Sequence, residues 1–500
     1  MNKPKSGKLD LKGCIIATIG PSCDTPSRFQ ELVDNGLGMA RINLSHGTVE
    51  DAIRKFEVIR SVDDSIPIML DLSGPKIRIG ALESSYNLVS GDQFTIQKED
   101  IIGNKQLMSI SYKELIDLAS IGDTFFLNDG LIEVKVMSKE EDSIVCEVVR
   151  GGPLSSRKGV NAPNIPIGLY PPTKKDIADL KGTIALKPDY YSVSFVRRAE
   201  DLMKVRFLIE NETGLTYGKD DPELPLLISK IEHKDGLKNI DEILQVSDAI
   251  MVARGDLGVE IDPTEVPLVQ KDLVKKSNKS GTPVIVATQM LESMVISPRP
   301  TRAEASDVAN AIFDGADAVM LSAETATGKF PVESVRTMKS IIQNLQTKIV
   351  PSDFYFKEEN LTSEEAIAKS AVLLADTLKA KAIIANTRSG RTARVVSKYR
   401  PSQKIVGITN SENVRRQLNL LWGVIPLSAQ ITFFDTDSMI ATGIFKAYKA
   451  GIVHKEDLVI VIAGSKLGQP FPTNLIQYYR VKDILDAEEG KRRLKTYQIS

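Results

Sequence analysis

The sequence predicts an α/β protein: a (β/α)8 TIM barrel with an inserted small β-barrel lid domain and a C-terminal open α/β domain. Eight short apolar runs, most of them separated by helical patterns, occupy much of the first 350 residues. Between the third and fourth of these runs, the pattern is interrupted for roughly a hundred residues, in which apolar residues recur at every second position. After about residue 350, a second and shorter series of alternating helical and strand-like stretches follows. Because 500 residues exceed the ~100–200 of an ordinary domain, several hydrophobic cores are expected.

The eight apolar runs are rich in valine and isoleucine and do not alternate with polar residues, which is typical of buried parallel strands. They cover residues 14–20, 39–45, 66–74, 190–196, 225–232, 249–256, 283–290 and 318–325. Helix-period stretches separate most of them, at residues 49–62, 199–212, 237–246, 264–277, 302–313 and 331–350. A closed barrel of ~250 residues has eight such units. An open doubly wound sheet is the alternative arrangement.

The break in this pattern predicts an all-β insertion. Within residues 82–149, short alternating runs are separated by the turn sequences SGD and NDG. After residue 350, helical residues 364–378 lead to a strand-like run at 382–385, which begins a smaller open α/β domain. The predicted domains are a barrel of residues 1–74 and 172–348, a lid of residues 75–171 and a C-terminal domain of residues 349–500.

Composition excludes several classes of protein. Lys and Arg number 64 and Asp and Glu 65, so the formal net charge is −1 and no global basic field attracts nucleic acid or a membrane surface. Three cysteines without a C-x-x-C pair exclude a disulfide framework and fit a reducing cytoplasm. No apolar run reaches the ~20 residues of a membrane span, and residues 1–13 lack the apolar core of a signal peptide. A cytoplasmic protein is expected.

Charged residues follow the predicted strands at the end where (β/α)8 barrels place their active sites. They are Arg41, Lys76, Arg78, Lys230, Asp71, Glu232, Asp256 and Glu324. This mixture suits an anionic phosphorylated substrate held with a divalent metal. Glu232 and Asp256 end neighbouring strands, where two hard oxygen ligands suit Mg²⁺. The alternative is an ion network in which they pair with Lys230 or Arg254.

Histidines and glycine-rich loops are few. His46 lies at a strand end and could contact a ligand, whereas His233 and His454 are expected to be satisfied or solvated. No G-x-x-x-x-G-K-[ST] loop exists, and residues 36–41 fail the dinucleotide fingerprint. In the last domain, NTRSGRT at residues 386–392 lies between a strand and a helix, where hydroxyls, a glycine turn and two arginines favour a bound phosphate. A capped helix with solvated arginines is the alternative.

Motifs along the whole chain resemble those of the pyruvate kinase family. They are ATIGPSC (17–23), ARINLSHG (40–47), LDLSGPKIRIG (70–80), KGVNAPN (158–164), SFVR (194–197), ISKIEHKDG (228–236), IMVARGDLGVEI (250–261), ATQMLESM (287–294), the run 298–331 and TRSGRTA (387–393). The resemblance implies a phosphotransferase that moves the phosphoryl group of phosphoenolpyruvate to ADP, giving pyruvate and ATP in the last step of glycolysis. It also implies a divalent cofactor, Mg²⁺ or alternatively Mn²⁺.

The same resemblance assigns roles by matching motif. Glu232 and Asp256 would hold the metal, Lys230 would neutralise the phosphoryl group in flight, and Arg41 and Arg78 would clamp phosphates. These are the positioning and charge-stabilising roles that phosphoryl transfer needs.

Further contacts come from the same motifs. The backbone at Gly255 and Asp256 would receive the substrate carboxylate, and Thr288 would help protonate the enolate through water. The remaining assignments are nucleotide-side contacts by Asn43, His46, Arg78 and Lys175. The insertion would close over the substrates as a lid.

One departure from the family concerns potassium. Members that need K⁺ have Thr, Lys and Glu where this chain has Leu72, Ser73 and Lys76. A lysine ammonium can supply the charge of the bound ion, so activity without K⁺ is expected. Asn43, Ser45 and Asp71, with Leu72, are the potassium-site equivalents, and the first three are expected to orient Lys76 instead.

A second departure concerns regulation. The effector phosphate loop of the family matches Thr387, Arg388, Ser389, Gly390, Arg391 and Thr392. Residues 464–474 lack the Trp and Arg with which animal members hold the second phosphate of fructose 1,6-bisphosphate. A monophosphate effector, such as a sugar phosphate or AMP, or no effector, is therefore expected. The resemblance also implies a homotetramer.

Two competing classes of function, another enzyme on a related barrel and a non-catalytic sensor, fit the sequence less well. A phosphoenolpyruvate synthase or dikinase needs a phosphorylated histidine on a mobile domain, and none of the three histidines lies in one. Related lyase barrels would leave the insertion and the last domain unexplained. A non-catalytic sensor with the same fold predicts loss of Lys230, Glu232 or Asp256, and all three are present.

Overall fold

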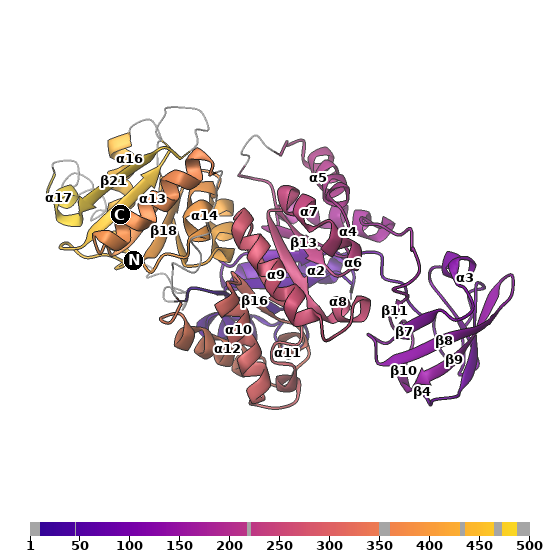
Figure 1. Ribbon diagram of the computed structural model, residues 1–500. Helices are drawn as coiled ribbons and strands as arrows, with labels where there is room; N and C mark the ends of the chain where they lie inside the picture. The colour runs from indigo at the N-terminus through magenta and orange to yellow at the C-terminus, as the bar shows by residue number, and fades with distance from the viewer. Residues whose placement is uncertain are drawn as a thin grey trace.

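The computed structural model describes residues 11–45, 47–217, 222–349, 361–430, 436–464 and 473–487. His46 and most of the predicted regulatory loop, residues 465–472, lie outside this range. Three bodies follow one another, with a central barrel between a C-terminal α/β domain and a β-rich lid (Figure 1). None of the described helices is long and apolar enough to cross a membrane.

The central body is a closed barrel of eight parallel strands, which confirms the fold prediction. The strands are β1 (Cys14–Thr18), β2 (Met39–Asn43), β3 (Ile68–Asp71), β12 (Tyr190–Val193), β13 (Leu226–Ile231), β14 (Ala249–Ala253), β15 (Val284–Ala287) and β16 (Ala318–Leu321). Strand β16 pairs with β1 and closes the ring. The open doubly wound alternative is therefore excluded.

Helices surround the barrel where the helical periodicity predicts most of them. They are α1 (Pro26–Asp34), α2 (Val49–Val62), α4 (Lys174–Thr183), α5 (Ala199–Thr213), α6 (Lys234–Lys238), α7 (Ile240–Val246), α8 (Arg254–Glu260), α9 (Val266–Ser280), α10 (Arg302–Asp314), α11 (Ala323–Ala326) and α12 (Pro331–Leu345). The stretch predicted at 237–246 lies in two helices that meet at Asn239. Helices α1 and α4 were not predicted. Both are short and largely polar, so their starts depend on the caps Thr25 and Thr173.

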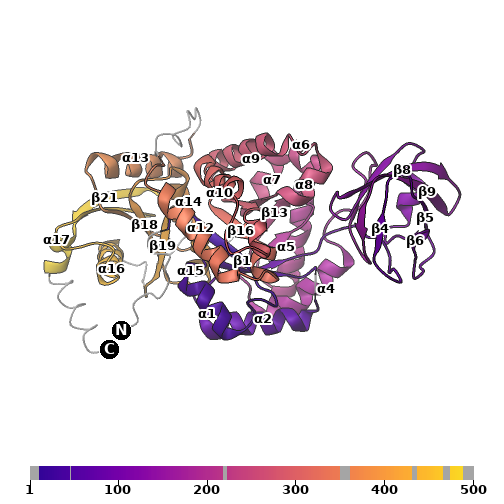
Figure 2. The ribbon, with the colours of Figure 1, turned by 90° about the horizontal axis from the view of Figure 1, so that it is seen from below.

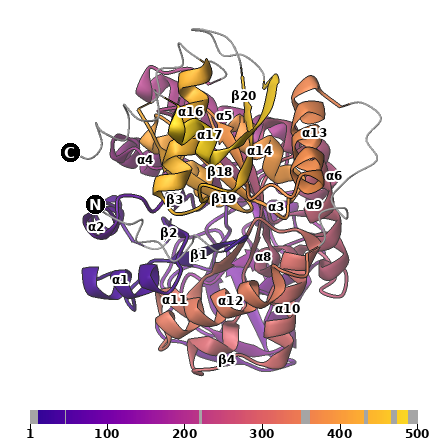
Figure 3. The same cartoon turned by 90° about the vertical axis from the view of Figure 1, so that its left-hand side faces the viewer.

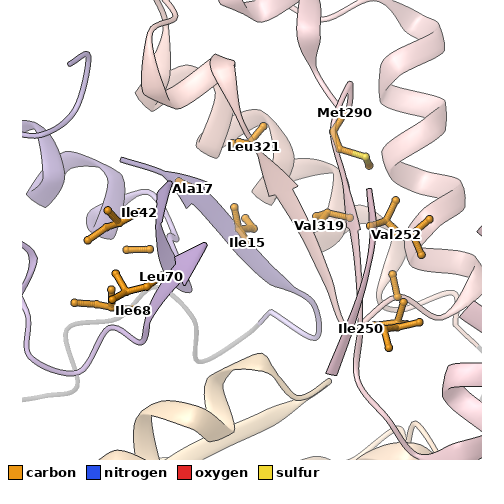
Figure 4. Packing of buried hydrophobic residues seen from close by; sticks show 14 of the residues in the cluster. Ile15, Ala17, Ile42, Ile68, Leu70, Ile250, Val252, Met290, Val319 and Leu321 are labelled. Atoms are coloured by element: carbon orange, nitrogen blue, oxygen red, sulfur yellow. The ribbon is translucent and has the colours of Figure 1, made fainter. Parts of the chain in front are cut away.

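The barrel strands divide their side chains between two apolar layers. On β1, Ile15 and Ala17 pack outward in the layer beneath the helices, which Figure 4 shows in close-up. Cys14 and Ile16 belong to the cluster inside the barrel. This division follows from the alternation of side chains along a strand, and because both faces are covered the strands are apolar throughout.

The insertion between β3 and α4 folds around its own apolar core. A six-stranded sheet has the order β11-β7-β8-β9-β5-β6, and β10 pairs with β4. The strands are β4 (Tyr86–Leu88), β5 (Gln93–Gln97), β6 (Leu107–Ser109), β7 (Thr124–Leu127), β8 (Ile132–Lys139), β9 (Ser143–Arg150), β10 (Gly152–Leu154) and β11 (Val160–Asn161), with helix α3 (Glu114–Leu118). This lid lies on the side of the barrel away from the C-terminal domain (Figure 2).

The C-terminal domain is an open sheet with the order β19-β18-β17-β20-β21, covered by helices. Its elements are α13 (Ser363–Thr377), β17 (Ala382–Asn386), α14 (Arg391–Lys398), β18 (Lys404–Thr409), α15 (Glu412–Gln417), β19 (Val424–Ser428), α16 (Thr436–Lys449), β20 (Leu458–Ala463), β21 (Leu475–Arg480) and α17 (Val481–Asp486). Strand β21 runs antiparallel at one edge. Figure 3 shows this domain in front of the barrel.

The C-terminal domain packs against the end of the barrel where the strands begin. Leu420 joins the apolar cluster inside the barrel. The hydroxyl of Tyr190 donates to the carbonyl of Gln417 at 2.6 Å. Arg400 donates to both carboxylate oxygens of Asp317 at 2.6 and 2.9 Å. The opposite end of the barrel therefore remains open toward the lid.

Candidate active site

The ends of neighbouring strands bring the predicted catalytic side chains together. Arg41 belongs to β2, Asp71 ends β3 and Lys230 lies in β13. Glu232 follows β13, and Asp256 lies in the first turn of α8, directly after β14. Because all eight strands are parallel, these residues share the C-terminal rim of the barrel.

Arg41 and Asp71 form a buried ion pair at the rim. The Nε and Nη2 atoms of Arg41 lie 2.7 and 2.5 Å from Oδ2 of Asp71. Nη1 of Arg41 donates to the hydroxyl of Thr18 at 2.8 Å. Ser192 donates to the other Asp71 oxygen at 2.7 Å. The arginine is thus held in one orientation, with its guanidinium at the strand ends.

Lys230 lies between two carboxylates. Its Nζ atom is 3.0 Å from Oε1 of Glu232 and 3.4 Å from Oδ1 of Asp71, and it donates to the hydroxyl of Ser194 at 2.7 Å. Burial lowers the pKa of Lys230, but Asp71 and Glu232 outweigh burial and raise it. For Asp71, burial raises the pKa, yet Lys230 and Arg41 bring it below the usual value. Both groups are therefore charged at neutral pH.

Glu232 is the second carboxylate beside Lys230. Its Oε2 atom accepts a hydrogen bond from the amide of Phe195 at 2.8 Å, and the residue is 1% exposed. Burial raises the pKa of Glu232, and Lys230 offsets only part of that effect. A divalent cation beside this carboxylate would lower its pKa again and favour the charged form.

The donor atoms at the rim suit a hard divalent cation. The described residues include no group of three or more His, Cys, Asp or Glu placed to hold a metal. Glu232 and Asp256 would supply two carboxylates, and substrate oxygens and water would supply the rest. That division is usual for Mg²⁺, which retains waters and binds through one or two carboxylates and phosphate.

Lys76 connects the barrel to the lid. Its Nζ atom lies 2.8 Å from Oδ1 of Asp256 and 3.1 Å from Oδ1 of Asp129, in the turn between β7 and β8. Burial lowers the pKa of Lys76, but Asp256 and Asp129 raise it above its ordinary value. The lysine is therefore a fixed positive charge beside a predicted metal ligand.

The expectation that Asn43, Ser45 and Asp71 orient Lys76 is wrong for this structure. Asn43 accepts a hydrogen bond from the amide of Ser45 at 3.0 Å, and Asp71 is paired with Arg41. Lys76 instead pairs with Asp256 and Asp129. The long lysine side chain reaches past the strand ends to carboxylates that are distant in sequence. Leu72 is buried in the outer apolar layer.

Thr288 has a strained backbone at the end of β15. Its φ angle is +69°, in the left-handed region that β-branched residues rarely adopt. Its hydroxyl accepts a hydrogen bond from the amide of Gly255 at 2.8 Å, and its carbonyl accepts one from Arg254 at 2.6 Å. Arg254 is in turn paired with Asp307 at 2.6 Å. Thr288 and the predicted carboxylate-binding backbone at Gly255 are therefore adjacent.

A cavity of about 730 Å³ separates the barrel rim from the lid. It is lined by five cations, Lys76, Arg78, Arg157, Lys158 and Lys175, and by Asp129. Arg78 donates to the carbonyl of Arg157 at 3.0 Å, and Lys175 to the carbonyl of Leu44 at 2.8 Å. Such a cavity suits a polyphosphate. Two predicted nucleotide contacts, Arg78 and Lys175, lie in its wall.

Several residues at the site had no predicted role. They are Ser192, Ser194, Asp129, Arg157 and Lys158. Ser194 and Lys158 lie inside the motifs quoted above, whereas Asp129 was interpreted only as part of a turn. The hydroxyl of Ser73, also in the cavity wall, is buried and has no hydrogen-bond partner within the described part of the chain.

Other predicted rim residues have structural roles. Both oxygens of Glu324 accept backbone hydrogen bonds, from Ser322 at 2.7 Å and Leu291 at 3.1 Å. It is fully buried and therefore braces the loop after β16 rather than facing ligand. His233 accepts a hydrogen bond from the amide of Asp235 at the start of α6, and His454 is exposed, as expected.

The predicted phosphate loop forms a tight turn into α14. Gly390 has a φ angle of +88°, and its amide donates to the hydroxyl of Thr387 at 2.9 Å. Arg391 pairs with Glu364 at 2.7 Å, whereas Arg388 is exposed. The hydroxyls of Thr392 and Thr473 are 2.9 Å apart.

The side-chain amide of Asn386 lies next to this loop. The residue is 2% exposed, and among the residues that the structure describes neither its oxygen nor its nitrogen has a hydrogen-bond partner. An unsatisfied buried amide is costly, so its place beside a predicted ligand loop is consistent with a polar ligand.

Comparison with known proteins places both parts of the fold in one family. Residues 11–335 match the model "Pyruvate kinase, barrel domain", and residues 365–477 match "Pyruvate kinase, alpha/beta domain". The chain is 42% identical over 490 residues to a pyruvate kinase of Sporosarcina psychrophila, covering 95% of this chain and 81% of the relative. It is 41% identical over 499 residues to one of Geobacillus stearothermophilus, covering 98% and 84%. The chain therefore belongs to the pyruvate kinase family, phosphotransferases that act between phosphoenolpyruvate and ADP.

Proposed function

We propose that Lys230, Glu232 and Asp256 carry out the phosphoryl transfer of this family at the rim of the barrel. The observation that supports this most directly is the Lys230 ammonium, fixed between Ser194 and Glu232 at 2.7 and 3.0 Å. Phosphoryl transfer depends mainly on positioning and on stabilising charge. A buried cation that is already held in place before the reaction provides both the positioning and the charge stabilisation.

Each neighbour of Lys230 has a role in this proposal. Arg41, oriented by Asp71, holds a phosphoryl oxygen together with Lys230, and Arg78 holds phosphates from the lid side. The backbone at Gly255 and Asp256 receives the substrate carboxylate. Thr288 orients the water that delivers a proton to the enolate carbon.

The metal in this proposal is Mg²⁺, with Mn²⁺ as an alternative, held by Glu232 and Asp256. When bound, it would act as a Lewis acid that stabilises negative charge on the phosphoryl and enolate oxygens. In the structure, Glu232 is paired with Lys230 and Asp256 with Lys76. The same two carboxylates would therefore neutralise both the lysines and the metal.

The nucleotide is proposed to bind in the cavity between barrel and lid, against Arg78 and Lys175, with Asn43 on the barrel side. His46, which lies outside the described residues, is proposed as a further nucleotide contact. The cationic wall of that cavity supports this assignment. One contact joins the lid to the barrel: the side-chain amide of Asn161 in β11 donates to Glu260 of α8 at 3.0 Å. Lid closure would exclude water from the transfer.

We also propose that Lys76 removes the need for K⁺. Its ammonium lies beside Asp256, so a fixed charge is already present near the phosphoryl group. The potassium-site equivalents Asn43, Ser45, Asp71 and Leu72 would then bind no ion. In support, Asp71 is already paired with Arg41 and Lys230.

The remaining proposals concern organisation. Domain limits at residues 74, 171 and 348 separate barrel, lid and C-terminal domain, and the protein is proposed to act in the cytoplasm as a homotetramer. The exposed edge strand β21, with Tyr478 62% exposed, supports assembly through the C-terminal domain. Multi-angle light scattering tests the assembly. The loop from Thr387 to Thr392 is proposed to bind a monophosphate effector.

The first experiment measures pyruvate formation from phosphoenolpyruvate and ADP with Mg²⁺ in tetramethylammonium buffer, with and without KCl. Wild-type activity should be full in both. Lys230→Met should lower kcat by about 10³-fold or more, because one preorganised charge is lost. Lys238→Met, an exposed lysine of α6, is the matched control. Equal rates for Lys230→Met and wild type would reject the assignment, and strong activation by KCl would reject potassium independence.

A further inference from the structure

Two stretches of chain join the lid to the barrel. One leaves the end of β3 and passes through Gly74, and the other returns from the lid to the start of α4 at Thr173. Figure 2 shows α4 on the side of the barrel nearest to the lid. A single side chain, the carboxylate of Asp176 in the first turn of α4, is hydrogen-bonded to both stretches.

The two oxygens of Asp176 bind different stretches. Oδ1 accepts a hydrogen bond at 3.0 Å from the amide of Gly74, which precedes Asp176 by 102 residues. Oδ2 accepts two hydrogen bonds, from the amide and the hydroxyl of Thr173, both at 2.8 Å. The residue is 1% exposed. A buried carboxylate needs such donors, so the burial of Asp176 depends on both stretches being in place.

Helix formation explains only half of this arrangement. Thr173 and Asp176 form a capping box, which is a common way to begin a helix. The bond to Gly74 is not part of that box, because it uses the other carboxylate oxygen and reaches a distant stretch of chain. Asp176 therefore has a second structural role, which is to fasten the two stretches to each other.

The outgoing stretch passes close to the proposed catalytic lysine. Gly74 has a φ angle of +67°, and a Cβ at this position would lie 2.7 Å from Cβ of Ser194. The hydroxyl of Ser194 donates to the carbonyl of Leu72 and accepts a hydrogen bond from Lys230, both at 2.7 Å. Lys76 follows two residues after Gly74. The position of Gly74 therefore determines where the side chain of Lys76 begins.

The return stretch is held on both sides of the same anchor. Before it, the ring of Tyr170 lies under Arg198 and Arg197, whose guanidinium carbons are 4.4 and 5.5 Å from the ring centre. Directly next to Asp176, Lys175 lies in the wall of the cavity between barrel and lid. The carboxylate thus connects the backbone that carries Lys175 to the stretch that leads into the lid.

We propose that Asp176 is a positioning residue for phosphoryl transfer: it fastens the two connecting stretches together and so fixes Lys76 and Lys175 relative to each other across the cavity. This inference rests on the proposed function, in which both lysines act at that cavity. Asp176 touches no reacting atom and acts only through the two lysines. Hinge residues far from the chemistry often change kcat and KM together when they are replaced.

The experiment compares Asp176→Asn with Thr173→Val. Asn has the shape of Asp but only one acceptor oxygen, so it can hold only one of the two stretches. Val at position 173 removes the capping hydroxyl but keeps the backbone amide, so both stretches remain fastened to Asp176. In steady-state assays, Asp176→Asn should lower kcat about tenfold or more and raise KM for ADP, because misplaced charges stabilise the transition state less well. Thr173→Val should have wild-type kinetic constants.

A second measurement does not depend on activity. Hydrogen–deuterium exchange of the free, full-length protein, followed by mass spectrometry, reports on both stretches. In Asp176→Asn, amides of at least one stretch, 72–78 or 167–173, should exchange about fivefold faster or more, because one hydrogen bond is lost. Exchange in Thr173→Val should match that of wild type in both stretches.

Two results would overturn the proposal. One is wild-type kinetic constants and wild-type exchange in Asp176→Asn. The other is an equal loss of activity in Asp176→Asn and Thr173→Val, which would show that only the helix cap matters. If wild type made no pyruvate from phosphoenolpyruvate and ADP, the proposed function itself would fail. The exchange data alone would then support or reject the fastening of the two stretches by Asp176.

Discussion

The ammonium nitrogen of Lys76 lies 2.8 Å from Oδ1 of Asp256, which is 180 residues away in the sequence, and 3.1 Å from Oδ1 of Asp129 in the lid. Gly159 makes room for this path, since a Cβ at that position would lie 2.7 Å from Cε of the lysine. One side chain therefore links the rim, the lid and a proposed metal ligand. The charge of Lys76 is therefore a structural part of the site, in addition to its proposed role as a substitute for K⁺.

Removal of that charge should create a dependence on potassium. Lys76→Met keeps the apolar stem but leaves Asp256 without its cation, so activity in tetramethylammonium buffer should fall by about tenfold or more. Added KCl should restore part of it, whereas wild type should not respond. Steady-state rates at constant ionic strength measure both effects. A variant as active as wild type without KCl would contradict the role given to Lys76.

Loss of either proposed metal ligand should weaken the use of Mg²⁺. Glu232→Gln and Asp256→Asn each remove one hard anionic oxygen donor, so the Mg²⁺ concentration for half-maximal rate should rise and kcat should fall by about 10²–10³-fold. Asp262→Asn, an exposed carboxylate just beyond α8, is the control. Mg²⁺ titrations identical to those of wild type would show that the carboxylates serve only the ion network.

Asp71→Asn should destabilise the barrel, because it leaves Arg41 and Lys230 with less counter-charge in a buried site. Removing one partner of a buried pair costs about 3–5 kcal/mol in the free energy of unfolding at pH 7. Since the pKa of Asp71 is lowered in the folded state, its stabilising charge is present above the unfolded value and is lost as pH falls.

The difference between wild type and Asp71→Asn should therefore be full at pH 7 and shrink below about pH 4, the usual aspartate pKa. Urea unfolding followed by circular dichroism at several pH values measures it. Asp34→Asn, at an exposed position of α1, should show no comparable change. A difference that grows in acid would contradict the sign assigned here.

The contact between barrel and C-terminal domain should depend on Arg400 and Asp317. Both are nearly inaccessible, at 3% exposure each, and Asp317 also accepts hydrogen bonds from the amides of Val284 and Trp422. Arg400→Met and Asp317→Asn should each lower the free energy of unfolding by about 3–5 kcal/mol. A double-mutant cycle by urea unfolding should give a coupling of about 1–3 kcal/mol, whereas simple additivity would show that the pair does not act as a unit.

The three cysteines should be unreactive in the folded protein. All are buried, and burial raises the pKa of Cys23 to about 11 and that of Cys146 to about 12. Because the thiolate is the reactive form, Ellman's reagent at pH 8 should release little colour from native protein and the full amount after unfolding in urea. Rapid reaction of the native protein would show that at least one thiol is accessible.

Much of the fold was predictable from local pattern. Eight apolar runs and their helical partners determine a barrel because parallel strands covered on both faces must be apolar throughout. Their C-terminal ends then meet at one rim, so Arg41, Lys230 and Glu232 could be grouped from sequence position alone. Family membership was equally predictable, since the motifs are continuous stretches of sequence. The short polar helices α1 and α4 escaped prediction because their caps carry more of the signal than periodicity does.

The tertiary structure decided which charged side chains form ion pairs with one another. Lys76 pairs with Asp256 and Asp129 instead of Asn43, Ser45 and Asp71. Both carboxylate oxygens of Glu324 accept hydrogen bonds from backbone amides. Long side chains choose partners by reach and burial, which strand order does not specify. The same holds for the cavity of about 1170 Å³ between the barrel and the C-terminal domain, because it exists only where two domains meet. The sequence alone thus determined the reaction and the elements that carry it, and packing between distant segments determined the ion pairs and the cavities.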